Sequence, residues 1–209
     1  MTNNAYLNGK YLPLSQTTIS PMDRGFLFGE AIYEVISYIN GKLFQASAHI
    51  KRLFNGLKAI DLKHAFETEQ LLEMMRTLVA NSEVKTGLIY LQITKGCPDK
   101  RQHLPISREA PTIFAYSSEY DFPPYDRRAE GYHAYTHNDL RWARCDIKST
   151  SLLANIMALQ SVAQKKSDSY EVILIRDNYL QEGCASAVFI EKNGHIYSIN
   201  LKKHIFKFP

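Results

Sequence analysis

Two reactive side chains occupy positions where the chain could use them for catalysis. Lys148 lies between a predicted strand end and a predicted helix start, which fixes its backbone and leaves its side chain mobile. A lysine amine becomes a nucleophile or a base when it loses its charge. Glu182 follows after a further helix and strand, so the chain can return its carboxylate to the same pocket. By residue type alone, each is more often a solvated surface residue.

Asn-Gly pairs mark three predicted hairpins. Each pair lies between β-prone runs, and both of its residues tolerate the positive φ that a tight hairpin turn requires. The pairs stand at 8–9, 40–41 and 193–194.

Apolar periodicity predicts the remaining elements. We expect Thr68 to cap one helix, and Ser149, Thr150 or Ser151 to cap another, because hydroxyl side chains accept from free helix N–H groups. The predicted helices cover 47–60, 68–81 and 152–164, and the predicted strands cover 87–94, 111–117, 131–136 and 170–176.

The pattern of helices and strands predicts an α+β protein of two domains. Pro123 and Pro124 mark a linker over 121–128. It would join an N-terminal α+β domain, residues 1–120, to a second domain, residues 129–209.

Composition excludes several classes of protein. Apolar residues make up 45% and charged residues 22% of the chain, as in ordinary globular proteins. The net charge is only +4 and the basic residues are scattered, apart from a basic C-terminus, so nucleic-acid binding is not expected. The three cysteines, Cys97, Cys145 and Cys184, form no CxxC pair. We therefore expect neither a disulfide framework nor a metal site. No run approaches the ~20 apolar residues of a membrane span, and no signal peptide is recognisable, so we expect a cytoplasmic protein.

Familiar single motifs are missing, but four segments form a distributed pattern. The chain contains no GxGxxG, P-loop, HExxH or GxSxG sequence. In order along the chain, the segments are DRGFLFGEAIYEV (23–35), AHIKRLFNGLKAI (48–60), RWARCDIKSTSLLANIMALQSVAQ (141–164) and SYEVILIRDNYLQEGCASAVFI (169–190). Together they resemble the fold-type IV pyridoxal-phosphate enzymes, which include D-amino-acid aminotransferases, branched-chain aminotransferases and aminodeoxychorismate lyase.

The resemblance assigns cofactor-binding roles to four residues. Lys148 resembles the lysine that binds pyridoxal 5'-phosphate as a Schiff base and later moves the substrate α-proton. Glu182 resembles the carboxylate that pairs with the pyridine nitrogen and keeps the ring an electron sink. Arg52 resembles the arginine that grips the phosphate. Ser186 stands in a run, CASA, that carries fewer hydroxyls for the phosphate than most family members.

Three further residues are expected to bind substrate. Tyr33 resembles the tyrosine that reaches the substrate carboxylate. The loop KGCPDKRQHLP resembles a family loop whose Arg-x-His pair captures the α-carboxylate, here Arg101 and His103. The spacing from His103 to Pro105 is one residue short, which leaves Lys100 and Gln102 as alternatives. The segment 23–25 is expected to form a structural turn beside a dimer interface.

Within the family, the sequence RWARCDIKS favours the D-amino-acid branch. The expected reaction moves an amino group from a D-amino acid such as D-alanine to a 2-oxo acid such as 2-oxoglutarate, in a protein expected to be a homodimer. Aminodeoxychorismate lyase, a branched-chain aminotransferase and a non-catalytic remnant are the alternatives.

Family resemblance stops after Ser198, where the chain continues with Ile199, Asn200 and the run LKKHIFKFP. Family members continue with further strands and helices that supply groups around the cofactor phosphate. We therefore expect an incomplete second domain and weakened cofactor binding.

Overall fold

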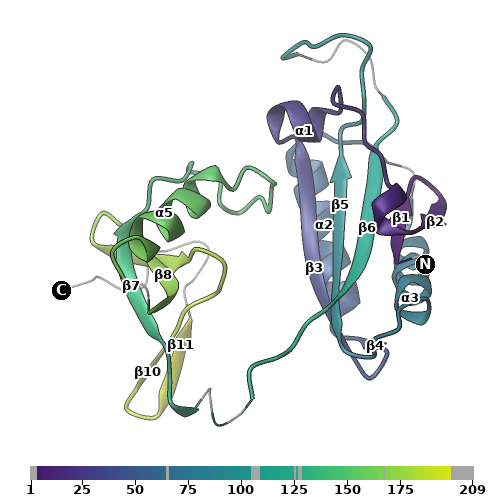
Figure 1. Ribbon diagram of the computed structural model, residues 1–209. Coiled ribbons are helices and arrows are strands. Elements are labelled where there is room, and N and C mark those ends of the chain that lie inside the picture. The colour runs from purple at the N-terminus through teal and green to yellow at the C-terminus, as the bar shows by residue number, and fades with distance from the viewer. Residues whose placement is uncertain are drawn as a thin grey trace. The chain divides into compact units, whose positions relative to one another are not determined.

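The computed structural model describes residues 4–64, 66–104, 109–124, 126, 129–166 and 168–198. They form two compact units (Figure 1). Unit 1 comprises Met1–Phe122 and Ile147–Ser151, and unit 2 comprises Pro123–Asp146 and Leu152–Pro209. The mixture of helices and strands agrees with the predicted α+β class. The predicted domain limits differ from this division in one segment, because 147–151 packs with unit 1. Residues 125, 127 and 128 of the predicted linker, and the C-terminal segment 199–209, lie outside the described residues.

A six-stranded antiparallel sheet forms the centre of unit 1. Its strand order is β2-β1-β6-β5-β3-β4. The strands are β1 (Ala5–Leu7), β2 (Lys10–Leu12), β3 (Ala31–Ile39), β4 (Lys42–Leu43), β5 (Gly87–Thr94) and β6 (Thr112–Glu119). A 3-10 turn, η1 (Leu14–Gln16), and a short helix, α1 (Arg24–Phe28), lie between β2 and β3.

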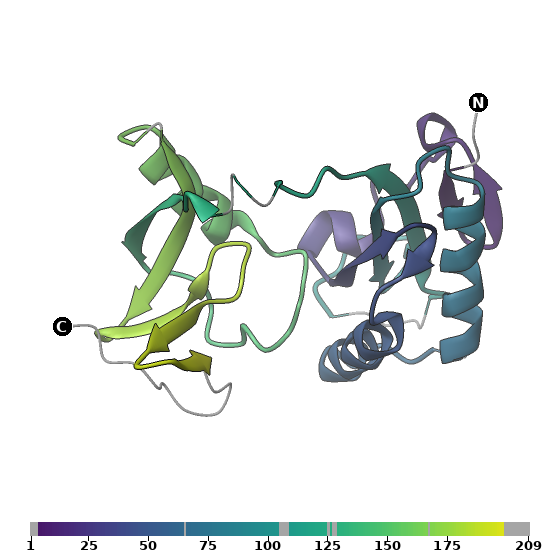
Figure 2. The same cartoon turned by 90° about the horizontal axis from the view of Figure 1, so that it is seen from below.

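Two amphipathic helices, α2 (Ala46–Ala59) and α3 (Thr68–Ala80), bury their apolar sides against the sheet (Figure 2). Because side chains alternate along a strand, one face of the sheet carries the aliphatic core and the other carries half-buried aromatic rings. The helices and the sheet meet through Ile32, Ile36, Ile50, Leu53, Leu57, Met75, Leu78, Ile89, Leu91 and Ile93, all at most 1% exposed.

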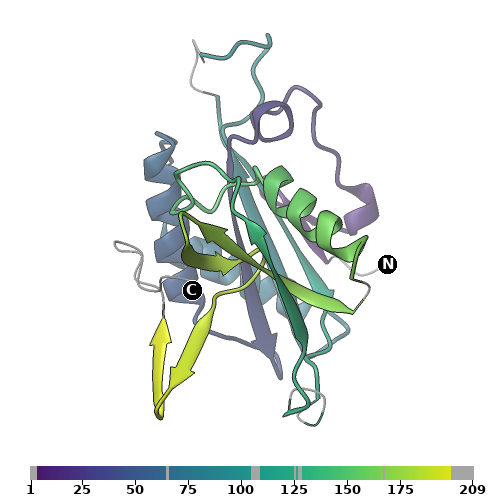
Figure 3. The same cartoon turned by 90° about the vertical axis from the view of Figure 1, so that its left-hand side faces the viewer.

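Unit 2 contains a three-stranded sheet, a helix and a hairpin. Strand β7 (His133–Asn138) pairs in parallel with β8 (Ser169–Arg176), and β8 pairs antiparallel with β9 (Tyr179–Gly183). Helix α5 (Leu153–Ala163) packs on β7 and β8 (Figure 3). Strands β10 (Phe189–Lys192) and β11 (His195–Ser198) form the hairpin. Ala158, Val162, Val172, Leu174 and Cys184 are the buried residues of this unit's core.

The three predicted hairpins are confirmed. In each Asn-Gly pair both residues have positive φ, for example 51° at Asn40 and 74° at Gly41. The predicted helices and strands are also present, with ends that differ by up to two residues.

The predicted helix caps are wrong. Glu67, not Thr68, precedes α3, and its backbone N–H donates to the Gln70 side chain at 2.7 Å. Ser149–Ser151 do not cap α5, which begins after Leu152 without a side-chain cap bond. Instead, Ser149 and Thr150 pair with β3, a long-range contact that the local sequence does not reveal.

No helix among the described residues is both long enough and apolar enough to cross a membrane.

Candidate functional site

Lys148 is held against the first residues of β3. Strand β4 pairs only with Tyr38 and Ile39, so the outer edge of β3 is open where the strand begins. The segment 147–151 pairs with this open edge. Tyr33 N donates to Lys148 O at 3.1 Å, and Thr150 N donates to Ala31 O at 3.2 Å. Ser149 forms an isolated antiparallel β-bridge with Ile32.

The segment 147–151 is anchored by a buried residue, Ile147, and the neighbouring Lys148 side chain lies against an aromatic ring. Ile147 is 6% exposed and belongs to the core of unit 1, whereas the Lys148 side chain is half-buried. The Lys148 Nζ lies 4.2 Å from the centroid of the Tyr33 ring. Tyr33 stacks on Tyr90, with ring centroids 5.7 Å apart. Burial raises the pKa of Tyr90 to about 12, so this hydroxyl is neutral at ordinary pH. Two of the predicted site residues, Lys148 and Tyr33, therefore lie in contact.

Arg52 meets a buried carboxylate on the other face of β3. Its Nε and Nη2 donate to the two oxygens of Glu34, each at 2.6 Å, and His49 Nδ1 lies 2.7 Å from Glu34. The Glu34 side chain is 1% exposed. Burial raises the pKa of Glu34, but the hydrogen bonds from Arg52 and His49 outweigh burial and leave the pKa below its usual value. The pKa of Arg52 is raised in turn, chiefly by its hydrogen bonds to Glu34.

Sequence reasoning missed Glu34 and His49. A signal was available, because Glu34 alternates with Ile32 and Ile36 at core-facing positions of a strand, and a buried carboxylate requires a partner. The proposed contact of Arg52 with a phosphate stays a prediction.

The side chains of Arg101 and His103 lie against the ring of Phe28. The Arg101 guanidinium carbon is 5.0 Å from that ring's centroid, and the His103 ring centroid is 5.6 Å from it. Both side chains belong to exposed residues. The structure thus brings together the predicted Arg-x-His pair, while Pro105, on which the spacing argument depends, lies outside the described residues.

Arg24 holds the backbone of the same loop. It is 2% exposed; its Nε pairs with Glu30, its Nη1 donates to Gln102 O at 2.6 Å, and its Nη2 donates to His103 O at 2.8 Å. Asp23 caps α1 by accepting from Gly25 N at 2.7 Å. The segment 23–25 is therefore the start of a helix rather than the expected turn.

In unit 2, Glu182 stands in β9 and pairs with Arg141. Arg141 also binds Asp139, whose side chain is 1% exposed, and Arg176 lies 3.0 Å from the same carboxylate.

Burial raises the pKa of Asp139, but the hydrogen bonds and charge of Arg141 outweigh burial and lower this pKa overall. Burial lowers the pKa of Arg141, and the hydrogen bonds to Asp139 and Glu182 reverse this effect, so the guanidinium stays charged. The Glu182 side chain remains 42% exposed.

The turn after β9 is organised by Glu171. Its carboxylate accepts from the Ser186 hydroxyl at 2.6 Å and from Cys184 N at 3.2 Å. From α5, Asn155 Nδ2 donates to Cys184 O at 2.7 Å. Ser186 is therefore already bound to a carboxylate of the chain, and its proposed contact with a phosphate stays a prediction. Glu171 and Arg141, which position Ser186 and Glu182, were not identified from the sequence.

The predicted site residues fall into two groups. Tyr33, Arg52, Arg101, His103 and Lys148 belong to unit 1. Glu182 and Ser186 belong to unit 2. The approach of the Lys148 amine to the Glu182 carboxylate remains a prediction.

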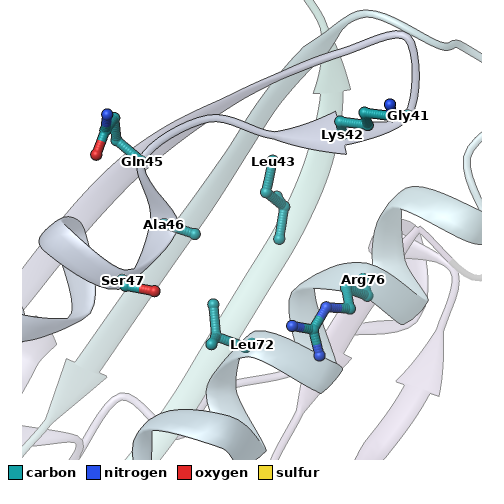
Figure 4. A pocket seen from close by; sticks show the side chains of 8 residues that line it. All are labelled: Gly41, Lys42, Leu43, Gln45, Ala46, Ser47, Leu72 and Arg76. Atoms are coloured by element: carbon teal, nitrogen blue, oxygen red, sulfur yellow. The ribbon is translucent and has the colours of Figure 1, made fainter.

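A pocket of about 510 Å³ in unit 1 contains none of these residues (Figure 4). It lies by the β3–β4 hairpin, beyond the end of β3 opposite Tyr33. Arg76, which lines it, pairs with Glu69 at 2.6 Å and with Glu73 at 3.3 Å. Its lining comprises Gly41, Lys42, Leu43, Gln45, Ala46, Ser47, Leu72 and Arg76.

Comparison with known proteins places this geometry in a family. The model of the amino-transferase class IV family matches residues 31–207. The D-alanine aminotransferase of Staphylococcus aureus (strain MSSA476) is 36% identical over 200 residues, which cover 96% of this chain and 70% of that protein. The D-alanine aminotransferase of Bacillus licheniformis is 35% identical over 192 residues, which cover 91% of this chain and 66% of that protein.

Solved structures show the same fold at lower identity. The branched-chain aminotransferase of Thermoproteus uzoniensis, solved with norvaline, has a TM-score of 0.83 at 19% identity, covering 99% of this chain and 71% of that one. The branched-chain amino acid aminotransferase of Escherichia coli has a TM-score of 0.79 at 15% identity, covering 95% of this chain and 68% of that one. With the family match over most of the chain, these findings show that the chain belongs to the class IV aminotransferases, a family of enzymes that depend on pyridoxal 5'-phosphate.

Proposed function

We propose that this chain uses pyridoxal 5'-phosphate to move the amino group of a D-amino acid, such as D-alanine, to a 2-oxo acid, such as 2-oxoglutarate. The observation that carries the proposal is the Lys148 amine, fixed at the edge of β3 and set over the Tyr33 ring. The choice of a D-amino acid rests on relatives named D-alanine aminotransferase that are 34–36% identical.

The chemistry of the donor groups fits this cofactor. When bound, the cofactor supplies an aldehyde that reacts with amines and a ring that withdraws electrons from the substrate α-carbon. Lys148 offers the amine, Arg52 a cation for the phosphate, and Glu182 a carboxylate for the ring nitrogen. Ser186 offers a hydroxyl to the phosphate once it leaves Glu171.

Lys148 would carry the proton in the reaction. Its free amine would take the substrate α-proton as general base. Tyr33 limits where that amine can go, since the ring face lies directly against Nζ. A confined amine reaches the α-carbon from one side, which is the requirement for acting on one enantiomer.

Arg101 and His103 would bind the substrate carboxylate together with the Tyr33 hydroxyl. Two cationic or hydrogen-bonding groups presented from one loop suit a planar carboxylate. We also propose that the chain assembles as a homodimer, which sedimentation of the purified protein would test.

Covalent capture of the cofactor tests this proposal most directly. The purified chain is incubated with pyridoxal 5'-phosphate, reduced with borohydride and digested, and the cofactor is located by mass spectrometry. We expect it on the peptide that contains Lys148, and we expect Lys148→Ala to abolish its attachment.

Turnover tests the substrate. Production of pyruvate from D-alanine and 2-oxoglutarate, with little from L-alanine, would support the D-amino-acid activity. Cofactor attachment with faster turnover of L-leucine would favour a branched-chain aminotransferase instead, and a protein that folds without taking up the cofactor would contradict the whole proposal.

A further inference from the structure

Arg24 is buried, and each of its three guanidinium nitrogens has a partner. The side chain is 2% exposed, its Nε pairs with the Glu30 carboxylate, and its Nη atoms donate to the consecutive carbonyls of Gln102 and His103 at 2.6 and 2.8 Å. A planar fork can reach two consecutive carbonyls at once, whereas a lysine ammonium presents a single point charge. The fork therefore fixes both the position and the direction of the backbone at 102–103.

Burying a guanidinium is costly unless its charge and its donors are satisfied. Glu30 supplies the opposing charge, and Lys95 lies 3.4 Å from the same carboxylate. An apolar side chain would close this part of unit 1 without such cost. The burial of the Arg24 guanidinium is therefore explained by its hydrogen bonds to the backbone of the loop at Gln102 and His103.

That loop carries the exposed residues Arg101 and His103, and both of their side chains lie against the ring of Phe28. Phe28, the last residue of α1, has the Arg24 guanidinium 4.7 Å from its ring centroid and Arg101 5.0 Å from it. The His103 ring lies 5.6 Å from the same ring. One short helix therefore contacts the loop backbone through Arg24 and the loop side chains through Phe28.

The first residues of the loop are tied to the same helix. Arg24 N donates to Gly96 O at 2.9 Å, and Gly96 N donates to the Thr94 hydroxyl at 3.0 Å. Asp23 accepts from the hydroxyls of Thr94 and Thr112, at 2.9 and 2.7 Å, and so joins α1 to the ends of β5 and β6. The loop leaves the sheet at a fixed point and is held again at 102–103.

We propose that Arg24 is a positioning residue that fixes the loop carrying Arg101 and His103 and thereby sets how tightly the chain binds the carboxylate of its amino-acid substrate. This inference rests on the proposed function, because it takes the carboxylate-binding role of Arg101 and His103 from there. Arg24 itself touches neither substrate nor cofactor; it acts through the loop.

The test compares Arg24→Met and Arg24→Lys with the wild-type chain loaded with pyridoxal 5'-phosphate. We expect Arg24→Met to raise the KM for D-alanine by about tenfold or more, with a smaller change in kcat, since two charge-assisted hydrogen bonds are lost. Arg24→Lys should recover part of the loss. Borohydride capture of the cofactor on Lys148 should be unchanged in both variants. Arg76→Met, on the exposed side of α3, is the control for removing an arginine.

Two further readouts separate positioning from general damage. Hydrogen exchange of peptides covering 96–104 should accelerate in Arg24→Met, while exchange in α5 stays as in the wild type. In the double variant Arg24→Lys with Arg101→Ala, the KM should rise by less than the product of the two single effects, since Arg24 acts through the loop that carries Arg101 and His103.

An unchanged KM in both Arg24 variants, or equal losses in KM, kcat and cofactor capture, would overturn the role of Arg24 and leave the proposed function standing. If Arg24→Met does not fold, Arg24→Lys alone decides the question by the same criteria. A wild-type chain that captures no cofactor and turns over no D-alanine contradicts the proposed function itself.

Discussion

The Nζ of Lys148 lies 4.2 Å from the centroid of the Tyr33 ring, and the backbones of the two residues are joined by a hydrogen bond from Tyr33 N to Lys148 O of 3.1 Å. The ring is itself supported, because Tyr33 stacks on Tyr90 and the Tyr90 hydroxyl donates to Gln92 at 2.7 Å. Residues far apart in sequence thus fix both the base and the tip of one lysine. Tyr33 can therefore affect the reaction in two ways, through its ring and through its hydroxyl.

Substitution of Tyr33 separates these two effects. Tyr33→Phe keeps the ring beside Lys148 and removes the hydroxyl, so we expect the KM for D-alanine to rise by about fivefold, the value of one hydrogen bond, with kcat nearly unchanged. Tyr33→Leu removes the aromatic face as well and should lower kcat. Steady-state kinetics measure both. Equal kinetics for Tyr33→Phe and the wild type would exclude the hydroxyl from substrate binding.

The pair of Glu34 and Arg52 predicts a dependence of stability on pH. Burial alone would raise the pKa of Glu34, but the hydrogen bonds from Arg52 and His49 outweigh it, so the folded-state pKa lies below the ordinary value of 4.5. A carboxyl with a lowered folded pKa contributes stability above its unfolded pKa and loses it as the pH falls through the folded value. We therefore expect the free energy of unfolding to decline below pH 4.5. In Glu34→Gln this decline should be shallower, with the remainder due to groups such as Asp139, whose pKa is also lowered. Urea unfolding at a series of pH values measures both slopes, and identical slopes would show that Glu34 is not linked to folding.

The sequence predicts features whose causes are local. The Asn-Gly turns need only two residues that tolerate positive φ, and α2 and α3 need only apolar residues at helical spacing. The pairing of 147–151 with β3 could not be read locally, because it depends on β4 being too short to cover the whole edge of β3. Likewise, Lys148, Tyr33 and Glu182 were identified by family resemblance, but the pairing of Glu182 with Arg141 required the tertiary structure.

Gly96 and Gly9 form a matched pair for testing the start of the 96–104 loop. Both have positive φ, 80° and 93°, so replacement by alanine strains the backbone at either position. A Cβ at Gly96 would lie 2.2 Å from Ala110 O, whereas nothing lies within 4 Å of a Cβ at Gly9. We expect Gly9→Ala to cost about 1 kcal/mol and Gly96→Ala about 2 kcal/mol more, because backbone must move. Urea unfolding gives both values, and equal losses would contradict the close approach at Ala110.

Thiol reactivity tests the packing of unit 2. Burial raises the pKa of Cys184 to about 11, and the residue is 7% exposed, whereas Cys97 is exposed. Only the thiolate attacks an aromatic disulfide reagent, so at about pH 8 we expect Cys97 to react promptly and Cys184 only after unfolding. Mass spectrometry of peptides assigns each modification. Labelling of Cys184 at the rate of Cys97 in the folded chain would show that the turn at 183–186 is open.

Arg141 joins the buried Asp139 to Glu182, so its removal should affect both stability and cofactor binding. The Arg141 side chain is 10% exposed, and its loss leaves Asp139, 1% exposed, with Arg176 as its remaining cation. We expect Arg141→Met to reduce the free energy of unfolding by about 3 kcal/mol, as for other broken buried ion pairs. The exposed pair of Arg144 and Asp146 provides the control, and Arg144→Met should change stability by less than about 1 kcal/mol.

The effect of Arg141 on the cofactor is separable from its effect on stability. If Arg141 orients Glu182 toward the ring nitrogen, Glu182→Gln and Arg141→Met should each weaken binding of pyridoxal 5'-phosphate. The double variant should then bind the cofactor no more weakly than Glu182→Gln alone, because the two residues act as one unit. Titration of the cofactor by absorbance, under conditions where every variant is folded, measures these affinities. Additive losses in the double variant would mean that Arg141 serves unit 2 only as a structural ion-pair partner, and that Glu182 keeps its position without it.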